Sequence, residues 1–139
     1  MSRLDQTHSG PTRIHAVRSP LFSALVGLAG VGVLLQGVWA GLFIREGQDV
    51  NETWVEVHAR GAEITIFIAL VATVVALVKL RSRPALVVGS LAFLVLLVGE
   101  SYIGGLVGDQ QLLEVVHFPL AMALLGLAVW LPVAAARPR

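Results

Sequence analysis

Long apolar runs separated by short polar stretches divide this chain into four segments. The run from Ser19 to Ile44 contains no Asp, Glu, Lys or Arg. As a helix rising about 1.5 Å per residue, it is long enough to cross a hydrocarbon core of about 30 Å. Three more runs follow, each with only a few charged residues. The pattern predicts membrane-spanning helices at about 21–44, 57–78, 84–107 and 112–136.

The connection between the second and third spans, from Lys79 to Pro84, is too short for anything but an antiparallel helix pair. Pro84 suits the first turn of a helix, where a missing N–H loses no partner. The predicted fold is therefore all-α: a polytopic, antiparallel four-helix transmembrane bundle, with residues 1–20 as a tail. A signal peptide is the alternative for the first span, but its apolar region should have only about 7–15 residues.

Composition narrows the class of protein. The chain has 139 residues, of which 56% are hydrophobic and 14% charged, whereas soluble domains carry roughly 25% charged residues. A small soluble domain could not bury that much apolar surface, which argues against a soluble enzyme and against a nucleic-acid partner. The absence of cysteine excludes disulfides, thiolate zinc sites and iron–sulfur clusters.

The basic residues are distributed asymmetrically. Eight of the ten fall on one side of the predicted membrane: Arg3, Arg13, Arg18, Lys79, Arg81, Arg83, Arg137 and Arg139. Only Arg45 and Arg60 fall on the other. The positive-inside rule therefore predicts that both termini are cytoplasmic. The abundant Ala, Val, Leu, Gly and Arg fit a high-GC bacterial genome, and so we expect a multi-pass protein of the bacterial inner membrane.

The chain also contains an internal repeat. At an offset of 64, the matching positions are Gln36 with Glu100, Ala40 with Gly104, Gly41 with Gly105 and Leu42 with Leu106. After the next loop, Val-His occurs in both copies, at His58 and His117. The two copies have the same orientation, so a pseudo-axis along the membrane normal relates them. This symmetry predicts that the two histidines lie at one depth on facing sides of the bundle.

Two facing imidazoles near the outer ends of two helices have the geometry that ligates a haem iron from both sides. We expect His58 and His117 to be the iron ligands of a b-type haem. Small neighbours would leave room for the ring, and Arg60 or Arg45 could neutralise its propionates. The small residues are Gly61, Ala62, Gly104, Gly105 and Ala121.

Other interpretations stay open. The histidines could be interfacial anchors with no cofactor bound, or zinc ligands completed by Glu56 or Glu114. Glu63 is three residues from Arg60 and could pair with it.

Glu100 is costly inside a membrane, and Gln36 across the pseudo-axis is a candidate partner. It could serve proton uptake, contact a ring substituent or hold helices together. On these alternatives the chain would be a small proton-coupled transporter, with Glu100 as the coupling carboxylate, or an accessory subunit of a larger membrane complex.

The stretches from Glu56 to Arg60, from Leu113 to Ala121 and from Leu124 to Leu131 resemble one four-helix half of the bacterial haem A synthase family. That family places a histidine at the outer start of the second and of the fourth helix in each half. The resemblance implies haem binding by His58 and His117. The spacing of Glu56 and Arg60 around His58 departs from the family pattern, so whether the chain is an enzyme stays open.

The same family joins two such halves, and so synthase chemistry would require two copies of this chain. A homodimer through the 21–44 helix is one expectation, with Gly27, Gly30 and Gly37 at its interface. The alternative is that these glycines pack inside the bundle.

Overall fold

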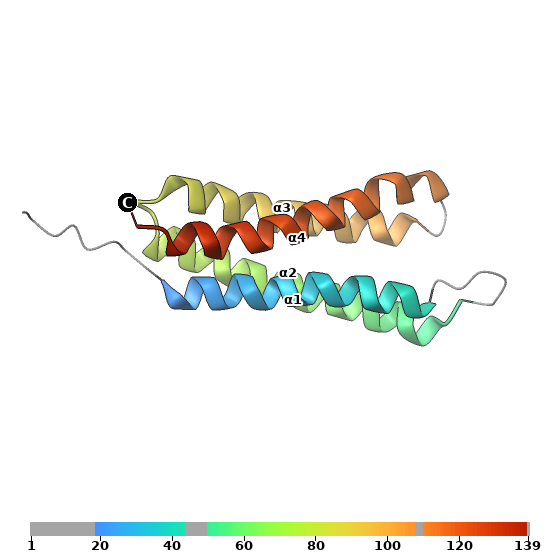
Figure 1. Cartoon of the computed structure of the whole chain (residues 1–139). Helices are drawn as coiled ribbons and strands as arrows, with labels where there is room; N and C mark the ends of the chain where they lie inside the picture. Colours follow the sequence, from blue (N-terminus) through green and yellow to red (C-terminus); the bar gives the residue numbers. More distant parts are fainter. Residues whose placement is uncertain (1–18, 44–49, 108–109, 139) are drawn as a thin grey trace, which may run out of the picture.

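The computed structural model describes residues 19–43, 50–107 and 110–138, and these form an all-α four-helix bundle (Figure 1). The predicted fold class is confirmed. The helices are α1 (Pro20–Phe43), α2 (Glu52–Lys79), α3 (Pro84–Leu106) and α4 (Glu114–Ala136), with a short 3-10 turn, η1 (Gln111–Leu113), before α4. The predicted tail lies outside the described residues, apart from its last two positions.

Two helix starts differ from the sequence prediction. Helix α2 begins at Glu52 rather than 57, because Asn51 caps it: the Asn51 side chain accepts a hydrogen bond from the Trp54 backbone N–H at 3.4 Å. Helix α4 begins at Glu114 rather than 112, after η1. Apolar runs mark where a helix enters lipid, whereas a helix that projects into water needs only a cap and good helix formers.

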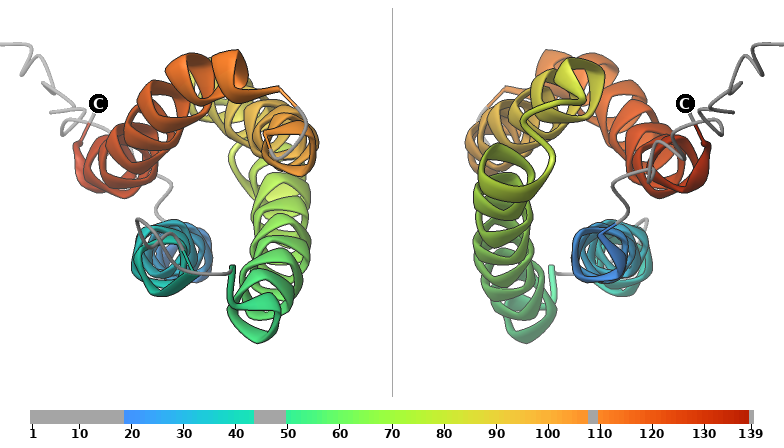
Figure 2. Two further views of the ribbon diagram at one scale, coloured as in Figure 1. Left: turned by 90° about the vertical axis from the view of Figure 1, so that its right-hand side faces the viewer. Right: turned by 90° about the vertical axis from the view of Figure 1, so that its left-hand side faces the viewer.

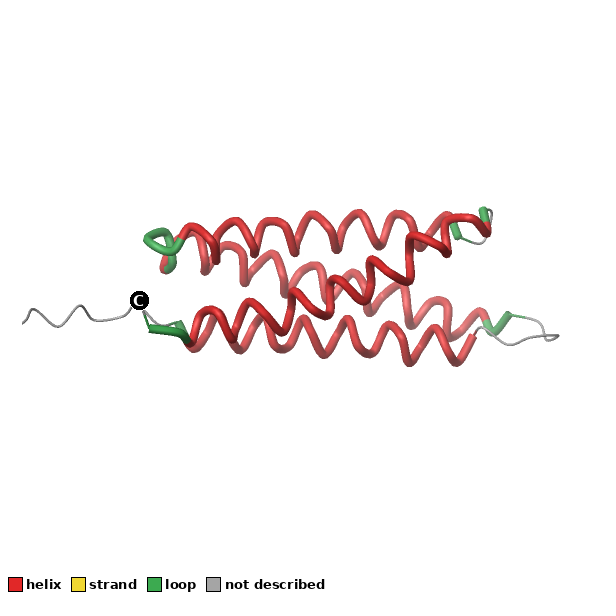
Figure 3. Tube along the Cα trace, turned by 45° about the horizontal axis from the view of Figure 1, so that its top comes forward, coloured by secondary structure: helices red, strands yellow, loops and turns green. Residues whose placement is uncertain are grey.

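The helices pack as a ring in chain order. Helix α1 contacts α2 and α4, and α3 contacts the same two, while no contact joins the diagonal pairs among the described residues. Figure 2, viewed along the bundle, shows this arrangement. In Figure 3 the described loops all lie at the two ends of the bundle. Helices α2 and α4, which carry His58 and His117, are therefore diagonal partners.

Each of the four helices is long and apolar enough to span a membrane. Within each apolar stretch, at most 28% of the residues are buried inside the chain. Large hydrophobic side chains such as Phe67, Val95 and Met122 are exposed around the whole bundle. Such a surface is stable in lipid and not in water. The chain is an integral, multi-pass membrane protein.

The packed core occupies only one part of the bundle. In α1 the buried residues end at Val33, and in α4 they begin at Leu124. In α2 they begin at Gly61, and in α3 they end at Glu100. Figure 1 shows the α1/α2 and α3/α4 pairs diverging toward the end beyond these residues. The end that carries both histidines therefore has no buried residue beyond these positions in the described helices. We call it the histidine end.

Small residues hold the other end together. Ala29, Ala69 and Ala128 are almost fully buried, which lets the helix backbones approach closely. A Cβ on Gly30 would lie 3.1 Å from that of Ala128, whereas one on Gly27 or Gly37 would meet nothing within 4 Å. Gly30 thus packs inside the bundle, as the alternative interpretation of these glycines expects. The homodimer itself stays a prediction.

The same end is closed by Arg83, which lies just before α3. Its guanidinium donates hydrogen bonds to the carbonyl oxygens of Ala135 at 2.8 Å and Ala134 at 2.7 Å. It also reaches the Arg137 carbonyl at 3.3 Å. These carbonyls lie at the end of α4, where the last C=O groups lack the usual i+4 partner, although Ala134 also accepts from the Arg137 backbone N–H at 3.4 Å. A cation there is favoured by the helix dipole. One side chain thus joins the α2–α3 turn to the last turn of α4.

Replacing Arg83 with alanine should lower the free energy of unfolding by about 1–3 kcal/mol, because charged hydrogen bonds to α4 are lost. Denaturant titration in detergent micelles, followed by circular dichroism, measures this change. Arg81→Ala is the matched control, since no side-chain hydrogen bond of Arg81 occurs within the described part of the chain. Equal stability of the two variants would contradict the capping role.

Candidate functional site

His58 lies near the start of α2 and faces α1. Its Nδ1 is 3.1 Å from the backbone oxygen of Gln36, and its ring meets Phe43 edge-on at a centroid distance of 5.4 Å. When Nδ1 carries the proton, it donates to the Gln36 carbonyl and leaves the lone pair of Nε2 free. That is the state in which an imidazole can ligate a metal.

The Gln36 side chain binds the backbone of α2 at the same place. With its nitrogen toward His58, the amide donates to the His58 carbonyl at 2.9 Å and reaches Nδ1 at 3.0 Å. Its oxygen accepts from the Ala62 backbone N–H at 3.0 Å. Gln36 therefore grips one turn of α2 and fixes where His58 sits.

Gly61 makes this grip possible. A Cβ at this position would lie 2.8 Å from the end of the Gln36 side-chain amide, at the atom that is the oxygen in this orientation, and would overlap the Trp39 ring. The sequence prediction placed Gly61 and Ala62 beside a porphyrin, on a flat helix face. In the structure Trp39 and Gln36 fill the space at Gly61 instead. Trp39 is not among the residues that the sequence predicts for the site, although it follows Gln36 by about one helical turn and so lies on the same face of α1.

His117 occupies the corresponding place in the second helix pair. Its Nδ1 is 3.0 Å from Oε1 of Glu100 on α3. Gly104 admits the ring, since a Cβ there would lie 2.9 Å from Cε1 of His117. The internal repeat predicted from the sequence also appears in the contacts. In each helix pair, the histidine lies beside the polar residue at the matching position of the preceding helix, which is Gln36 for His58 and Glu100 for His117.

Glu100 is buried, with 8% of its surface exposed. The short approach to His117 is not aligned as a hydrogen bond, and neither carboxylate oxygen has a hydrogen-bond partner among the described residues. The predicted partner, Gln36, is bound to α2 instead, and α1 and α3 do not touch within the described ranges. Burying this carboxylate without a partner costs more free energy than burying any other described side chain, unless a cation or a ligand offsets that cost.

The other predicted residues lie around this end. Ala62 and Ala121 are half-buried one turn beyond the histidines, and Gly105 is exposed, where an added Cβ would meet nothing within 4 Å. Arg60 is exposed on the outside of α2. It pairs with Glu63 at 3.1 Å, as the sequence predicts, and with Glu56 at 3.9 Å.

A zinc site is not assembled. No group of three or more His, Asp or Glu side chains that could hold a metal ion occurs in the described ranges. Glu56, one of the two predicted extra ligands, faces Arg60. Two histidines on diagonal helices suit a ligand that needs only two axial donors.

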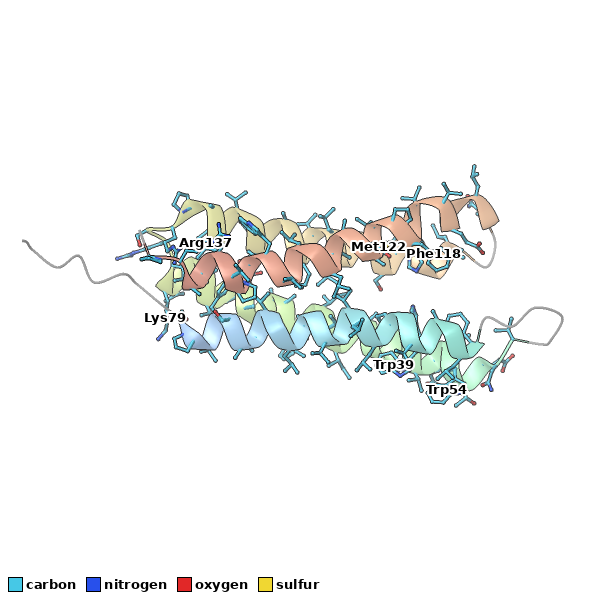
Figure 4. All side chains as sticks on the ribbon, viewed as in Figure 1. Trp39, Trp54, Lys79, Phe118, Met122 and Arg137 are labelled. Carbon is cyan, nitrogen blue, oxygen red and sulfur yellow. The ribbon has the colours of Figure 1, made fainter. Side chains whose placement is uncertain are left out.

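An apolar groove of about 420 Å³ opens on the outer surface of α1 and α2. Figure 4 shows Trp39 and Trp54 toward the histidine end of the bundle, with Lys79 and Arg137 at the opposite end. The groove is lined by Trp39, Thr53, Glu56, Val57, Arg60, Gly61 and Ile64. Neither histidine borders it, so it is separate from the candidate site.

Adding a methyl group at Gly61 should displace Trp39 and Gln36 and so destabilise the protein. We expect Gly61→Ala to lower the free energy of unfolding by about 1–3 kcal/mol, the usual cost of overpacking. Gly126→Ala is the control, because a Cβ there meets nothing within 4 Å. Denaturation in micelles and tryptophan emission measure both variants, and an undisturbed Gly61→Ala protein would refute the close packing at this turn.

Comparison of the chain with protein-family models, with curated proteins and with solved structures finds no match. The resemblance to haem A synthase is therefore still a prediction from the sequence, and the site must be argued from its own geometry.

Proposed function

We propose that this chain is a membrane haem protein, in which His58 and His117 are the axial ligands of one b-type haem at the histidine end. The observation that carries this proposal is the pair of imidazoles on diagonal helices at an end without a closed protein core. A flat apolar ring would supply the missing buried surface there. Bound haem would supply one-electron redox chemistry.

The surroundings of the two rings support this assignment. Metal-binding histidines almost always engage their second nitrogen with a carbonyl or a carboxylate, which fixes tautomer and orientation. His58 has the Gln36 carbonyl within reach of Nδ1, and His117 has the Glu100 carboxylate. Each Nδ1 atom thus has a protein oxygen nearby, at 3.1 Å for His58 and 3.0 Å for His117, and a ring that donates from Nδ1 leaves Nε2 for iron. Electron transfer is the activity that requires nothing more than this site.

Purified protein from haem-sufficient cells should show a Soret band and the reduced-minus-oxidised spectrum of a low-spin, bis-imidazole haem. His58→Ala and His117→Ala should each abolish that spectrum, because each removes an axial ligand. His8→Ala and His15→Ala are matched controls in the N-terminal segment and should leave it unchanged.

A colourless wild-type protein would overturn the haem proposal. The buried carboxylate of Glu100 would then favour the second candidate, a proton-coupled transporter. In that case Glu100→Gln should impair solute binding more than His58→Ala does.

We further propose that the protein lies in a bacterial inner membrane with both termini in the cytoplasm. Lys79, Arg83 and Arg137 lie at the same end of the bundle, opposite the histidine end. The positive-inside rule orients that end toward the cytoplasm. The haem would then lie near the outer face.

The orientation can be tested directly because the chain has no cysteine. A single cysteine at Ser82 should react with a membrane-impermeant maleimide only after cells are opened, whereas one at Gln110 should react in intact cells. The opposite labelling pattern would reverse the orientation.

A further inference from the structure

The two histidines meet protein partners of different chemistry. His58 has two groups near Nδ1: the Gln36 carbonyl at 3.1 Å, which can only accept a hydrogen bond, and the Gln36 amide nitrogen at 3.0 Å, which donates. These two groups favour opposite tautomers of the ring. Gln36 can therefore satisfy either tautomer of His58 and does not select one.

His117 instead faces a carboxylate. Oε1 of Glu100 is 3.0 Å from Nδ1, and an ionised carboxylate can only accept. With Glu100 ionised, this approach favours the tautomer with the proton on Nδ1 and the lone pair on Nε2, although the two atoms are not aligned as a hydrogen bond in the structure. Neither Glu100 oxygen has a hydrogen-bond partner in the described ranges, so no other donor competes with His117 for them.

The packing keeps the two groups together. Glu100 is buried in α3, and its side chain and that of His117 are only 11% and 17% exposed. Gly104, one turn after Glu100, gives the imidazole the room to lie against α3.

We infer that Glu100 is a positioning residue that makes His117 the more electron-rich of two unequal haem ligands and thereby favours the oxidised iron. The inference rests on the proposed haem site. A carboxylate that accepts the Nδ1 proton raises the basicity of the ligating nitrogen. The more basic ligand, with a negative charge behind it, stabilises ferric iron more than ferrous iron. Gln36, a neutral residue at the equivalent position, does this less for His58.

Redox titration of the purified holoprotein tests the inference. Glu100→Gln keeps the side-chain shape but removes the negative charge. At a fixed applied potential, the ratio of reduced to oxidised haem should rise about tenfold, which for one electron is a midpoint shift of about 59 mV. Glu114→Gln is the matched control: it removes an exposed carboxylate at the start of the same helix as His117. We expect it to change the ratio much less.

A holoprotein in which Glu100→Gln and Glu114→Gln shift the ratio equally, or in which Glu100→Gln leaves it unchanged, would overturn the inference. Should Glu100→Gln not accumulate, Glu100→Asp addresses the same question, since it keeps the charge but withdraws the oxygens from Nδ1. It should shift the ratio in the same direction by a smaller factor, and an unchanged ratio would again contradict the role.

A second measurement separates this inference from the haem proposal. Nitrogen NMR of the full chain without haem reports the tautomer of each histidine. We expect His117 in the Nδ1-protonated form in the wild type, and a loss of that preference in Glu100→Gln. A colourless protein with this tautomer would refute the haem site but retain the positioning role. An Nε2-protonated His117 in the wild type would refute the positioning role whether or not haem binds.

Discussion

The lipid around the bundle contains no water that could hydrogen-bond to polar groups, and the architecture of the protein follows from that constraint. Backbone groups must be satisfied inside helices, so the chain crosses the membrane only as helices. Polar side chains must find partners within the protein. Thr73 donates to the Ala69 carbonyl at 2.8 Å and Ser90 to the Leu86 carbonyl at 2.6 Å. The same requirement brings each half-buried histidine against a polar residue of the neighbouring helix.

The bundle divides into two parts with different tasks. At the cytoplasmic end in the proposed orientation, small residues bring the helices together, and Arg83 ties the α2–α3 turn to the end of α4. Beyond Val33 and before Leu124, α1 and α4 contribute no buried residue. A rigid closed end can hold the open end in position, because the helices are continuous between the two. This division suits a protein that places two imidazoles on either side of a ligand.

The repeat gives two similar half-sites, and single differences make them unequal. Gln36 and Glu100 occupy matching positions, yet one is a neutral amide bound to the backbone of α2 and the other a carboxylate against an imidazole. The glycine that allows each approach also lies on a different helix: Gly61 follows His58 on α2, whereas Gly104 follows Glu100 on α3. The internal repeat thus gives the two half-sites similar geometry, and the residues that differ between the copies give each half its own chemistry.

The sequence by itself determined the number of spans, the all-α class and the internal repeat that matches Gln36 with Glu100 and His58 with His117. Hydropathy and internal similarity carry that information because lipid imposes it on every residue along a span. Hydropathy did not indicate the exact start of α2, because that start depends on a local hydrogen bond from the Trp54 N–H to the Asn51 side chain and not on an apolar run.

Only the tertiary structure decided which groups touch. In the structure Gln36 contacts His58 rather than Glu100, and the Trp39 ring occupies the space beside Gly61. Gly30 packs against Ala128. The tertiary structure also assigned Arg83 to the end of α4, 51 residues away in sequence at the closest contact. These choices depend on helix rotation and on which helices are neighbours around the ring. A shift of one residue along a helix turns a side chain by about 100°, and no pattern in a single sequence fixes that angle.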